Sequence, residues 1–239
     1  MSNKHGDKIV AIIQARMGAS RLPNKMMLWL HGFPVAEWVY RRVSSSSLLS
    51  EIVFALPDRP ADQLLADFLT RRGALVFQGA EQDVLGRFYN AAKHHDADIV
   101  IRICADNPFV SGSEIDRLIR FCQEGDYDYA YNHIPRDNKY PDGLGAEIAP
   151  MSILHRLHET ATEPSHREHL FNYIWDHREM FRIATCDPDD LALAQPHLKL
   201  DLDTIDDYAR LLRLNVHPDM TAGEIVAAAL AEQTNRNRS

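Results

Sequence analysis

The sequence has little of what identifies several large classes of protein. Its three cysteines, Cys104, Cys122 and Cys186, form no C-x-x-C pair, which argues against a disulfide framework or a zinc knuckle and predicts reduced thiols. No apolar run approaches the roughly 18 residues of a membrane span. The apolar run that follows Lys4 and Lys8 has five residues, too few for a secretory signal peptide. We therefore expect a cytoplasmic protein with no membrane partner.

An excess of positive charge is also lacking. The formal net charge is -8, whereas nucleic-acid-binding proteins carry broad basic surfaces, so we expect no nucleic-acid partner. Neither the G-x-x-x-x-G-K-[ST] phosphate loop nor the G-x-G-x-x-G dinucleotide fingerprint occurs. With 45% hydrophobic and 25% charged residues over 239 positions, the composition predicts a single globular domain covering residues 1–239.

The most informative stretch lies near the N-terminus. The apolar run Ile9 to Ile13 predicts a buried first strand, and the polar loop that follows should open at the edge of a sheet, where α/β proteins bind ligands. Three cations, Arg16, Arg21 and Lys25, lie in this loop, and their local excess points to an anion such as phosphate. Backbone N–H groups around Gly18, Ser20 and Arg21 would assist. The alternative is a solvated basic loop without a ligand.

Strands and helices are predicted to alternate along the first half of the chain, which indicates an α/β fold with a doubly wound, mostly parallel sheet. The expected strands after the first are 51–56, 75–77, 98–104, 126–131, 181–185 and 198–204. The expected helices are 34–44, 61–72, 83–95, 113–122 with Ser113 as its cap, 151–160, 165–177, 205–214 and 221–233.

Charged residues at two strand ends suggest a metal site. Arg102 lies inside an otherwise apolar strand, so it should be ion-paired or reach a ligand, because a buried unpaired charge is costly. Asp106 follows that strand, where an oxygen ligand for Mg²⁺ would stand beside phosphates. Asp201 and Asp203 would share one face of the last strand. An Asx turn at Asp106 and a helix cap at Thr204 are the structural alternatives.

Three further segments have structural explanations that compete with functional ones. Pro57 to Pro60 is a turn in which Asp58 or Arg59 would touch a ligand, although a plain turn is favoured. Asp83 fits the first turn of a helix, where a carboxylate is stabilised by the helix dipole. Five histidines cluster between 155 and 177, but without H-E-x-x-H or a nearby cysteine they favour a solvated helical face over a zinc site.

The string Q-A-R-M-x-x-S-R-L-P-x-K, residues 14–25, resembles the nucleotide-binding loop of the CTP-dependent cytidylyltransferases, the family of CMP-3-deoxy-manno-octulosonate and CMP-sialate synthetases. The branch of spore-coat polysaccharide biosynthesis proteins is the most similar. Later segments also match family motifs: D-V-L-x-R at 83–87, R-x-x-A-D-x-P at 102–108, R-E-H at 167–169, and the Asp of V-D-T-x-x-D at Asp203. The likeness therefore covers nearly the whole chain.

The resemblance implies a fold of the nucleotide-diphospho-sugar transferase type and transfer of CMP from CTP to an acidic 2-keto sugar. It implies catalytic roles for Arg16, Lys25, Asp106 and Asp203, with the last two binding Mg²⁺. The implied nucleotide contacts are Gln14, Ala15, Arg16, Gly18, Ser20, Arg21, Lys25, Asp83, Arg87 and Arg102. The implied acceptor contacts are Asn107, Glu147, Arg167 and His169.

Two positions depart from the family pattern. Ala19 stands where a serine is usual, and Gly145 replaces the Asp of P-x-G-L-D-x-E, so the acceptor stays open. Residues 135–177 are expected to form an appendage on the acceptor side that makes a homodimer contact. Alternatives are a nucleotidyltransferase for another phosphorylated acceptor, a glycosyltransferase using Asp201-Leu202-Asp203 as its D-x-D, and a non-catalytic nucleotide-binding protein.

Overall fold

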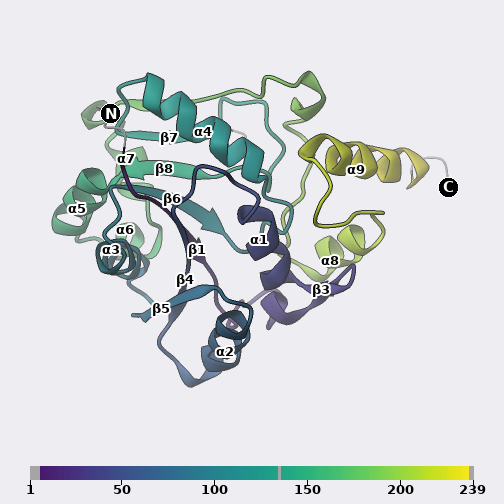
Figure 1. Ribbon diagram of the computed structural model, residues 1–239, viewed down its shortest axis with the longest axis horizontal. Helices are drawn as coiled ribbons and strands as arrows, with labels where there is room; N and C mark the ends of the chain where they lie inside the picture. Colours follow the sequence, from purple (N-terminus) through teal and green to yellow (C-terminus); the bar gives the residue numbers. More distant parts are fainter. Residues whose placement is uncertain (1–5, 134–135, 237–239) are drawn as a thin grey trace.

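A sheet of seven strands forms the centre of the protein, in a computed structural model that describes residues 6–133 and 136–236 (Figure 1). The strand order is β5-β4-β1-β6-β8-β7-β9. In chain order the strands are β1 (Ile9–Gln14), β4 (Glu51–Pro57), β5 (Leu75–Gly79), β6 (Ile99–Cys104), β7 (Tyr129–Tyr131), β8 (Glu147–Pro150) and β9 (Ile183–Thr185). All neighbours are parallel except that β8 runs antiparallel to β6 and β7. The predicted α/β class with a mostly parallel sheet is confirmed.

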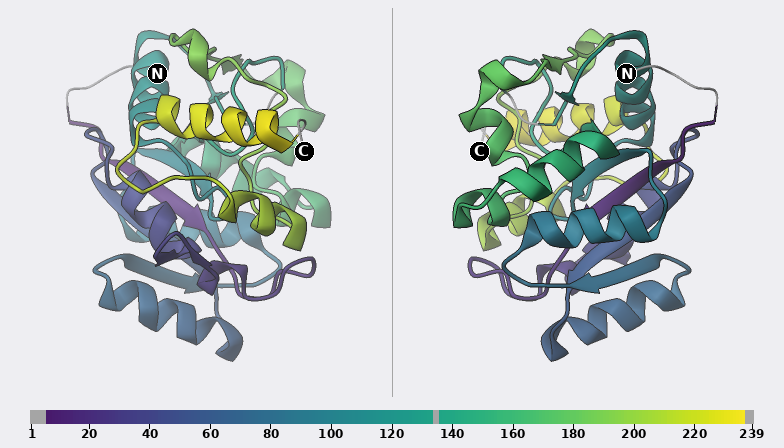
Figure 2. Two further views of the ribbon diagram at one scale, coloured as in Figure 1. Left: turned by 90° about the vertical axis from the view of Figure 1, so that its right-hand side faces the viewer. Right: turned by 90° about the vertical axis from the view of Figure 1, so that its left-hand side faces the viewer.

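Helices cover both faces of the sheet, as Figure 2 shows from two sides. One apolar core lies under α1 (Val35–Val43), α2 (Gln63–Arg71), α4 (Gly112–Glu124), α8 (Ile205–Leu212) and α9 (Ala222–Arg236). The other lies under α3 (Val84–His94), α5 (Met151–Thr160) and α7 (Asn172–Asp176), with α6 (Pro164–Glu168) beside α3. Strand β1 alternates between the two cores, which is why its sequence is continuously apolar.

Several helix ends differ from the sequence prediction. The N-cap of α4 is Ser111, whose hydroxyl accepts from the Glu114 N–H at 3.4 Å, and Ser113 instead bonds to the Ser111 hydroxyl. The helix predicted over 165–177 is interrupted. The backbone is extended at His169, and Leu170 and Phe171 are buried in the core before α7 begins. None of the described helices has the length and apolar character needed to cross a membrane.

The prediction of a strand over 198–204 is wrong, because this segment forms no strand of the sheet. This segment is extended and buries Leu198, Leu200 and Leu202, as its alternation suggested, but it joins its neighbour through a single bridge between Asp142 and Lys199. The segment that carries Asp142 turns at Gly143, whose φ of +97° suits glycine. The pairing therefore does not continue past Asp142 into a longer ladder. The N–H of Leu202 instead donates to the carbonyl of Asp106 at 2.8 Å. That bond brings the segment beside the end of β6.

One strand of the main sheet and one small hairpin were not predicted from the sequence. Strand β8 lies within the 135–177 range, yet it is an internal strand of the main sheet between β6 and β7. Pro135, the start of that range, lies outside the described residues. A small hairpin, β2 (Trp29–Leu30) with β3 (Phe33–Pro34), follows the basic loop and packs near α8, where the Tyr208 hydroxyl donates to the Trp29 carbonyl at 2.6 Å.

Candidate functional site

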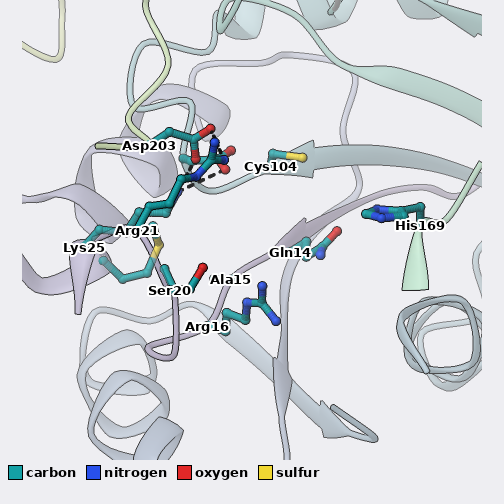
Figure 3. A pocket seen from close by; sticks show the side chains of 12 residues that line it. Gln14, Ala15, Arg16, Ser20, Arg21, Lys25, Cys104, His169 and Asp203 are labelled. Atoms are coloured by element: carbon teal, nitrogen blue, oxygen red, sulfur yellow. Dashed lines mark hydrogen bonds and ion pairs between the residues drawn. The ribbon is translucent and has the colours of Figure 1, made fainter. Parts of the chain in front are cut away.

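The loop after β1 borders a cleft of about 280 Å³ at the carboxyl edge of the parallel strands (Figure 3). A short 3-10 helix, η1 (Lys25–Met27), ends the loop. The cleft is lined by Gln14, Ala15, Arg16, Ala19, Ser20, Arg21, Lys25, Met26, Cys104, Asp106, His169 and Asp203. Most of the residues predicted for this loop therefore do meet in one cavity. Gly18 is not in the lining; it packs under Arg59, whose Nη2 lies 2.8 Å from where a Cβ would stand.

Lys25 joins the two predicted metal ligands. Its ammonium is 3.2 Å from Asp106 Oδ2 and 3.0 Å from Asp203 Oδ1, and it donates to the Leu202 carbonyl at 2.8 Å. Lys25 is only 7% exposed, so this charge is held in place by three acceptors. Asp106 follows β6 and Asp203 precedes α8. The bond between Leu202 and Asp106 brings these two segments together.

Arg21 lies at the open side of this cluster. Its Nη2 is 2.7 Å from Asp203 Oδ2, while its side chain is 67% exposed. Surface ion pairs of this kind contribute little free energy and exchange partners readily. Arg21 is therefore free to turn from Asp203 towards an anion in the cleft.

Asp106 and Asp203 fit a magnesium ion by their chemistry. Mg²⁺ in proteins commonly takes one or two carboxylates and completes its octahedron with waters and substrate phosphates. The described residues contain no group of three or more His, Cys, Asp or Glu side chains placed to hold a metal. Two carboxylates beside a basic loop suit a metal that arrives with phosphate oxygens.

A second cavity of about 730 Å³ adjoins the first and shares Gln14, Arg16 and His169 with it. Figure 3 shows these three side chains on the side of the first cleft away from Lys25. The buried Oε1 of Gln14 has no hydrogen-bond partner within the described part of the chain, so it is available to a ligand. The remaining lining residues are Glu81, Gln82, Asp83, Val84, Thr162, Pro164, Arg167 and Glu168.

Asp83 and Arg167 face this second cavity as an ion pair. Asp83 Oδ2 lies 2.5 Å from Arg167 Nη2, and Asp83 Oδ1 accepts from the Gly86 N–H at 2.9 Å, which caps α3. Burial opposes the charge of Asp83, but these hydrogen bonds hold its pKa below the usual range. Arg167 also donates to the His158 carbonyl at 3.0 Å. Both predicted residues thus reach the site, with the charge of Arg167 already neutralised.

Arg87, predicted as a nucleotide contact, lies beneath the site. It is 2% exposed and donates to the carbonyls of Ala80 and Glu81, the latter at 3.1 Å. Burial lowers its pKa to about 10. Neither cavity is lined by Arg87, which instead holds the turn between β5 and α3.

Arg102 and Glu147 form an ion pair inside the sheet, on adjacent strands β6 and β8. Glu147 is 2% exposed and also accepts from the Tyr129 hydroxyl, which lies within hydrogen-bonding distance. Burial would raise the pKa of Glu147, but the charge of Arg102, together with His133 and the hydrogen bonds from Tyr129 and Arg102, outweighs it and the pKa is lowered. Of the two alternatives for Arg102, the ion pair is confirmed. Neither residue lines the cavities, so the structure brings no ligand contact to them.

Asn107 is also buried behind the cleft. It is 2% exposed, and its Nδ2 lies 3.3 Å from Nδ1 of His133. Burial lowers the pKa of His133, which favours the neutral ring. The sequence prediction missed His133, as well as Cys104 and Met26 of the cleft lining. The sequence signal for Cys104 is that it ends the predicted strand 98–104; in the structure it pairs in register with Gln14 at the end of the neighbouring strand.

Basic loop, parallel sheet and paired carboxylates together define a nucleotidyltransferase of the α/β class, and comparisons with known proteins agree. The family model described as cytidylyltransferase matches residues 10–214. The chain therefore belongs to the cytidylyltransferase family.

Individual proteins extend this comparison. The spore coat polysaccharide biosynthesis protein SpsF of Bacillus subtilis is 30% identical over 229 residues, covering 91% of this chain and 92% of that protein. A 3-deoxy-manno-octulosonate cytidylyltransferase of Geobacter metallireducens is 30% identical over 113 residues, 47% of this chain and 43% of that protein. The structure of a cytidylyltransferase from Leptospira borgpetersenii superposes with a TM-score of 0.87 at 24% identity, covering 97% of this chain and 96% of that one. That likeness shows the fold.

Proposed function

We propose that this enzyme transfers CMP from CTP to an acidic 2-keto sugar, releases pyrophosphate, and so makes a CMP-sugar for a surface glycan. The observation on which the proposal mainly rests is the cluster of Lys25, Asp106 and Asp203 beside a loop that also presents Arg16 and Arg21. The similarity to a 3-deoxy-manno-octulosonate cytidylyltransferase and to SpsF supports the acceptor class and the glycan. We further propose a cytoplasmic homodimer.

The acceptor hydroxyl oxygen attacks the α-phosphorus and releases its proton to solvent, the bond from that phosphorus to the bridging oxygen breaks, and pyrophosphate leaves. Arg16, Arg21 and Lys25 would neutralise the charge that grows on the phosphate oxygens, while backbone N–H groups of the loop near Ser20 add fixed donors. Asp106 and Asp203 would hold Mg²⁺, which would supply charge neutralisation and orientation at the triphosphate. No covalent intermediate is needed, because positioning and electrostatic stabilisation suffice for phosphoryl chemistry of this kind.

Two cavities suit two substrates. The first, with the Lys25 cluster, would take the phosphates. The second would take the acceptor or the nucleoside beside Gln14, Arg16 and His169. Because Arg167 is paired with Asp83, an acceptor carboxylate would be met by Arg16 or His169 unless Arg167 changes partner.

The Gly145 departure has a structural cause. A Cβ at this position would stand 2.0 Å from the Asn132 carbonyl oxygen, and Asn132 holds Ala146 through two hydrogen bonds, of 2.8 and 3.1 Å. An aspartate therefore cannot replace Gly145 without moving the backbone of Asn132. Its polar contact with an acceptor is lost for a packing reason, which keeps the acceptor choice of this chain open to a sugar of different shape.

A D-x-D glycosyltransferase is less well supported. Asp201 is 9% exposed and does not line the cleft that Asp203 lines. Burial, with the neighbouring charge of Asp142, raises the pKa of Asp201, so this carboxyl is poorly suited to bind a metal together with Asp203.

Pyrophosphate release should be measured with each of CTP, UTP, ATP and GTP, with Mg²⁺ and a panel of acidic 2-keto sugars and sugar phosphates. We expect turnover with CTP and one acidic sugar. Turnover with a sugar phosphate would mean that the acceptor is a phosphorylated sugar and not an acidic 2-keto sugar. Release of a nucleoside diphosphate would favour the glycosyltransferase, and CTP binding without turnover across the panel would favour a non-catalytic protein.

A further inference from the structure

We propose that Arg59 and Asp62 are positioning residues that hold the basic loop in the shape needed to bind a triphosphate. Neither lines the cleft, and both come from the turn after β4, which ends in the 3-10 helix η2 (Pro60–Asp62). Their contacts reach the loop after β1 and the turn after β5. The inference rests on the proposed function of the loop as the phosphate site.

Asp62 anchors the backbone of the loop at Met17. The carboxylate is 0% exposed, and its Oδ1 accepts the Met17 N–H at 2.7 Å across 45 positions of sequence. The Met17 carbonyl in turn accepts from the N–H groups of Ala19 and Asn24, at 3.0 and 2.9 Å, and these bonds close the loop on itself. Both polar groups of the Met17 backbone are therefore fixed, so the loop is closed upon a residue that Asp62 holds in place.

Arg59 fixes Asp62 and covers the loop. Its Nε donates to Asp62 Oδ2 at 2.8 Å, and its Nη1 pairs with Glu81, a lining residue of the second cavity. The same guanidinium lies against Gly18, with Nη2 2.8 Å from the position of a Cβ. A guanidinium tied at both ends cannot easily move away. Gly18 is thus required by the close approach of Arg59.

A buried carboxylate is costly unless it is paired and hydrogen-bonded, and Asp62 uses its two oxygens for two different purposes. One orients the loop backbone and the other receives Arg59. Donors that are already oriented before the substrate arrives lose less free energy when charge develops, which is the advantage of preorganised sites. The pair therefore acts on phosphate binding and turnover through the loop.

The first experiment compares wild type, Asp62→Asn and Asp62→Ala in steady-state kinetics with CTP and the acceptor, together with hydrogen exchange at the Met17 amide. Asn can still accept from Met17 but cannot accept from Arg59, whereas Ala loses both contacts. We expect kcat/KM for CTP to fall about 10- to 100-fold in Asp62→Ala and less in Asp62→Asn, because small displacements of a positioned group cost this much. The acceptor KM should rise less than the KM for CTP, because Arg16 alone among the loop residues of the first cleft also lines the second cavity.

Asp67→Ala is the matched control. Asp67 is an exposed carboxylate on the adjoining helix α2, where it accepts from Gln63 Nε2 at 2.8 Å and contacts no part of the loop. The Asp67→Ala variant should have the kinetics and the Met17 amide exchange of wild type. Faster Met17 exchange is expected in Asp62→Ala. Unchanged kcat/KM for CTP with folded Asp62→Ala would overturn the proposal, as would an equal rise in both KM values.

The second experiment uses Gly18→Ala, which stays informative if Asp62→Ala fails to fold. The single variant should lower kcat/KM for CTP by pushing Arg59 aside, and Arg59→Ala should lower it by freeing Asp62. The double variant Gly18→Ala with Arg59→Ala should be no worse than Arg59→Ala alone, because the clash is gone. Additive losses would contradict the close packing of these residues. A wild type without CTP turnover would refute the proposed function, a result distinct from both.

Discussion

Lys25 and Asp203 are separated by 178 positions in the sequence, yet the lysine ammonium lies 3.0 Å from the carboxylate. Asp106 receives the same ammonium at 3.2 Å. This buried lysine bridges the two carboxylates, and all three side chains line the cleft, so the phosphate site and the metal ligands form one unit.

Replacing Lys25 by methionine should remove most of the activity. We expect kcat for pyrophosphate release to fall about 10²- to 10³-fold, the range seen when one preorganised donor to a transition-state charge is removed. The control is Lys93→Met, which removes an exposed lysine at the end of α3. Full activity in a folded Lys25→Met variant, judged by initial rates and circular dichroism, would exclude Lys25 from the chemistry.

Arg21→Ala should have opposite effects on two ligands. Without nucleotide, Asp203 loses a competing cation, so its affinity for Mg²⁺ or Mn²⁺ should rise by up to about fivefold, the scale of an exposed ion pair. Affinity for CTP with the metal should fall, because Arg21 can no longer turn towards phosphate. Isothermal titration calorimetry with the metal alone, and then with CTP and the metal, measures the two affinities separately. If both affinities fall together, Arg21 supports the site structurally and does not exchange partners.

Glu147→Gln should act on stability. It leaves the buried Arg102 charge without its carboxylate, which we expect to lower the free energy of unfolding by about 3–5 kcal/mol. CTP affinity of the folded variant should change little, since neither residue lines a cavity. The matched control is Asp189→Asn, which breaks an exposed pair with Arg117 and should not measurably alter stability. A loss of CTP affinity in Glu147→Gln at unchanged stability would restore a ligand role.

Acidic pH should reduce the difference in the free energy of unfolding between wild type and Glu147→Gln. The folded-state pKa of Glu147 is lowered, because its charged and hydrogen-bonding neighbours, Arg102 foremost, together outweigh burial. Its contribution to stability is therefore complete above the unfolded pKa of about 4.3. That contribution is lost as pH falls below this value through the folded pKa. Urea unfolding from pH 7 to pH 3 should show the two free energies converging below about pH 4. A constant difference over this range would mean that Glu147 does not titrate as an ion-pair partner.

The sequence predicted the parallel half of the sheet well, because β1, β4, β5 and β6 are apolar runs that end at turn residues. It missed β8, a strand of four residues between glycine-containing turns and a helix, since so short a run has no clear period. For 198–204 the alternation was correct, but strand pairing depends on a neighbour that sequence periodicity does not reveal.

The site was predicted in part for a similar reason. Residues of the first loop lie close together because they are close in sequence, and Asp106 and Asp203 joined them at the sheet edge as expected. Arg87, Arg102, Asn107 and Glu147 lie at or near strand ends and helix starts too, but their side chains are buried among other elements. Side-chain direction depends on packing partners that are distant in sequence, so position along the chain could not decide between ligand contact and structural support.

The most direct test of the account uses CTP labelled either at the α-phosphorus or at the γ-phosphorus, with the acceptor that supports pyrophosphate release. We predict that α-label appears in a CMP-sugar and γ-label appears in pyrophosphate, and that both transfers depend on Lys25. γ-Label in the sugar, or α-label remaining in a released nucleoside diphosphate, would contradict attack at the α-phosphorus and with it the assignment of the cleft.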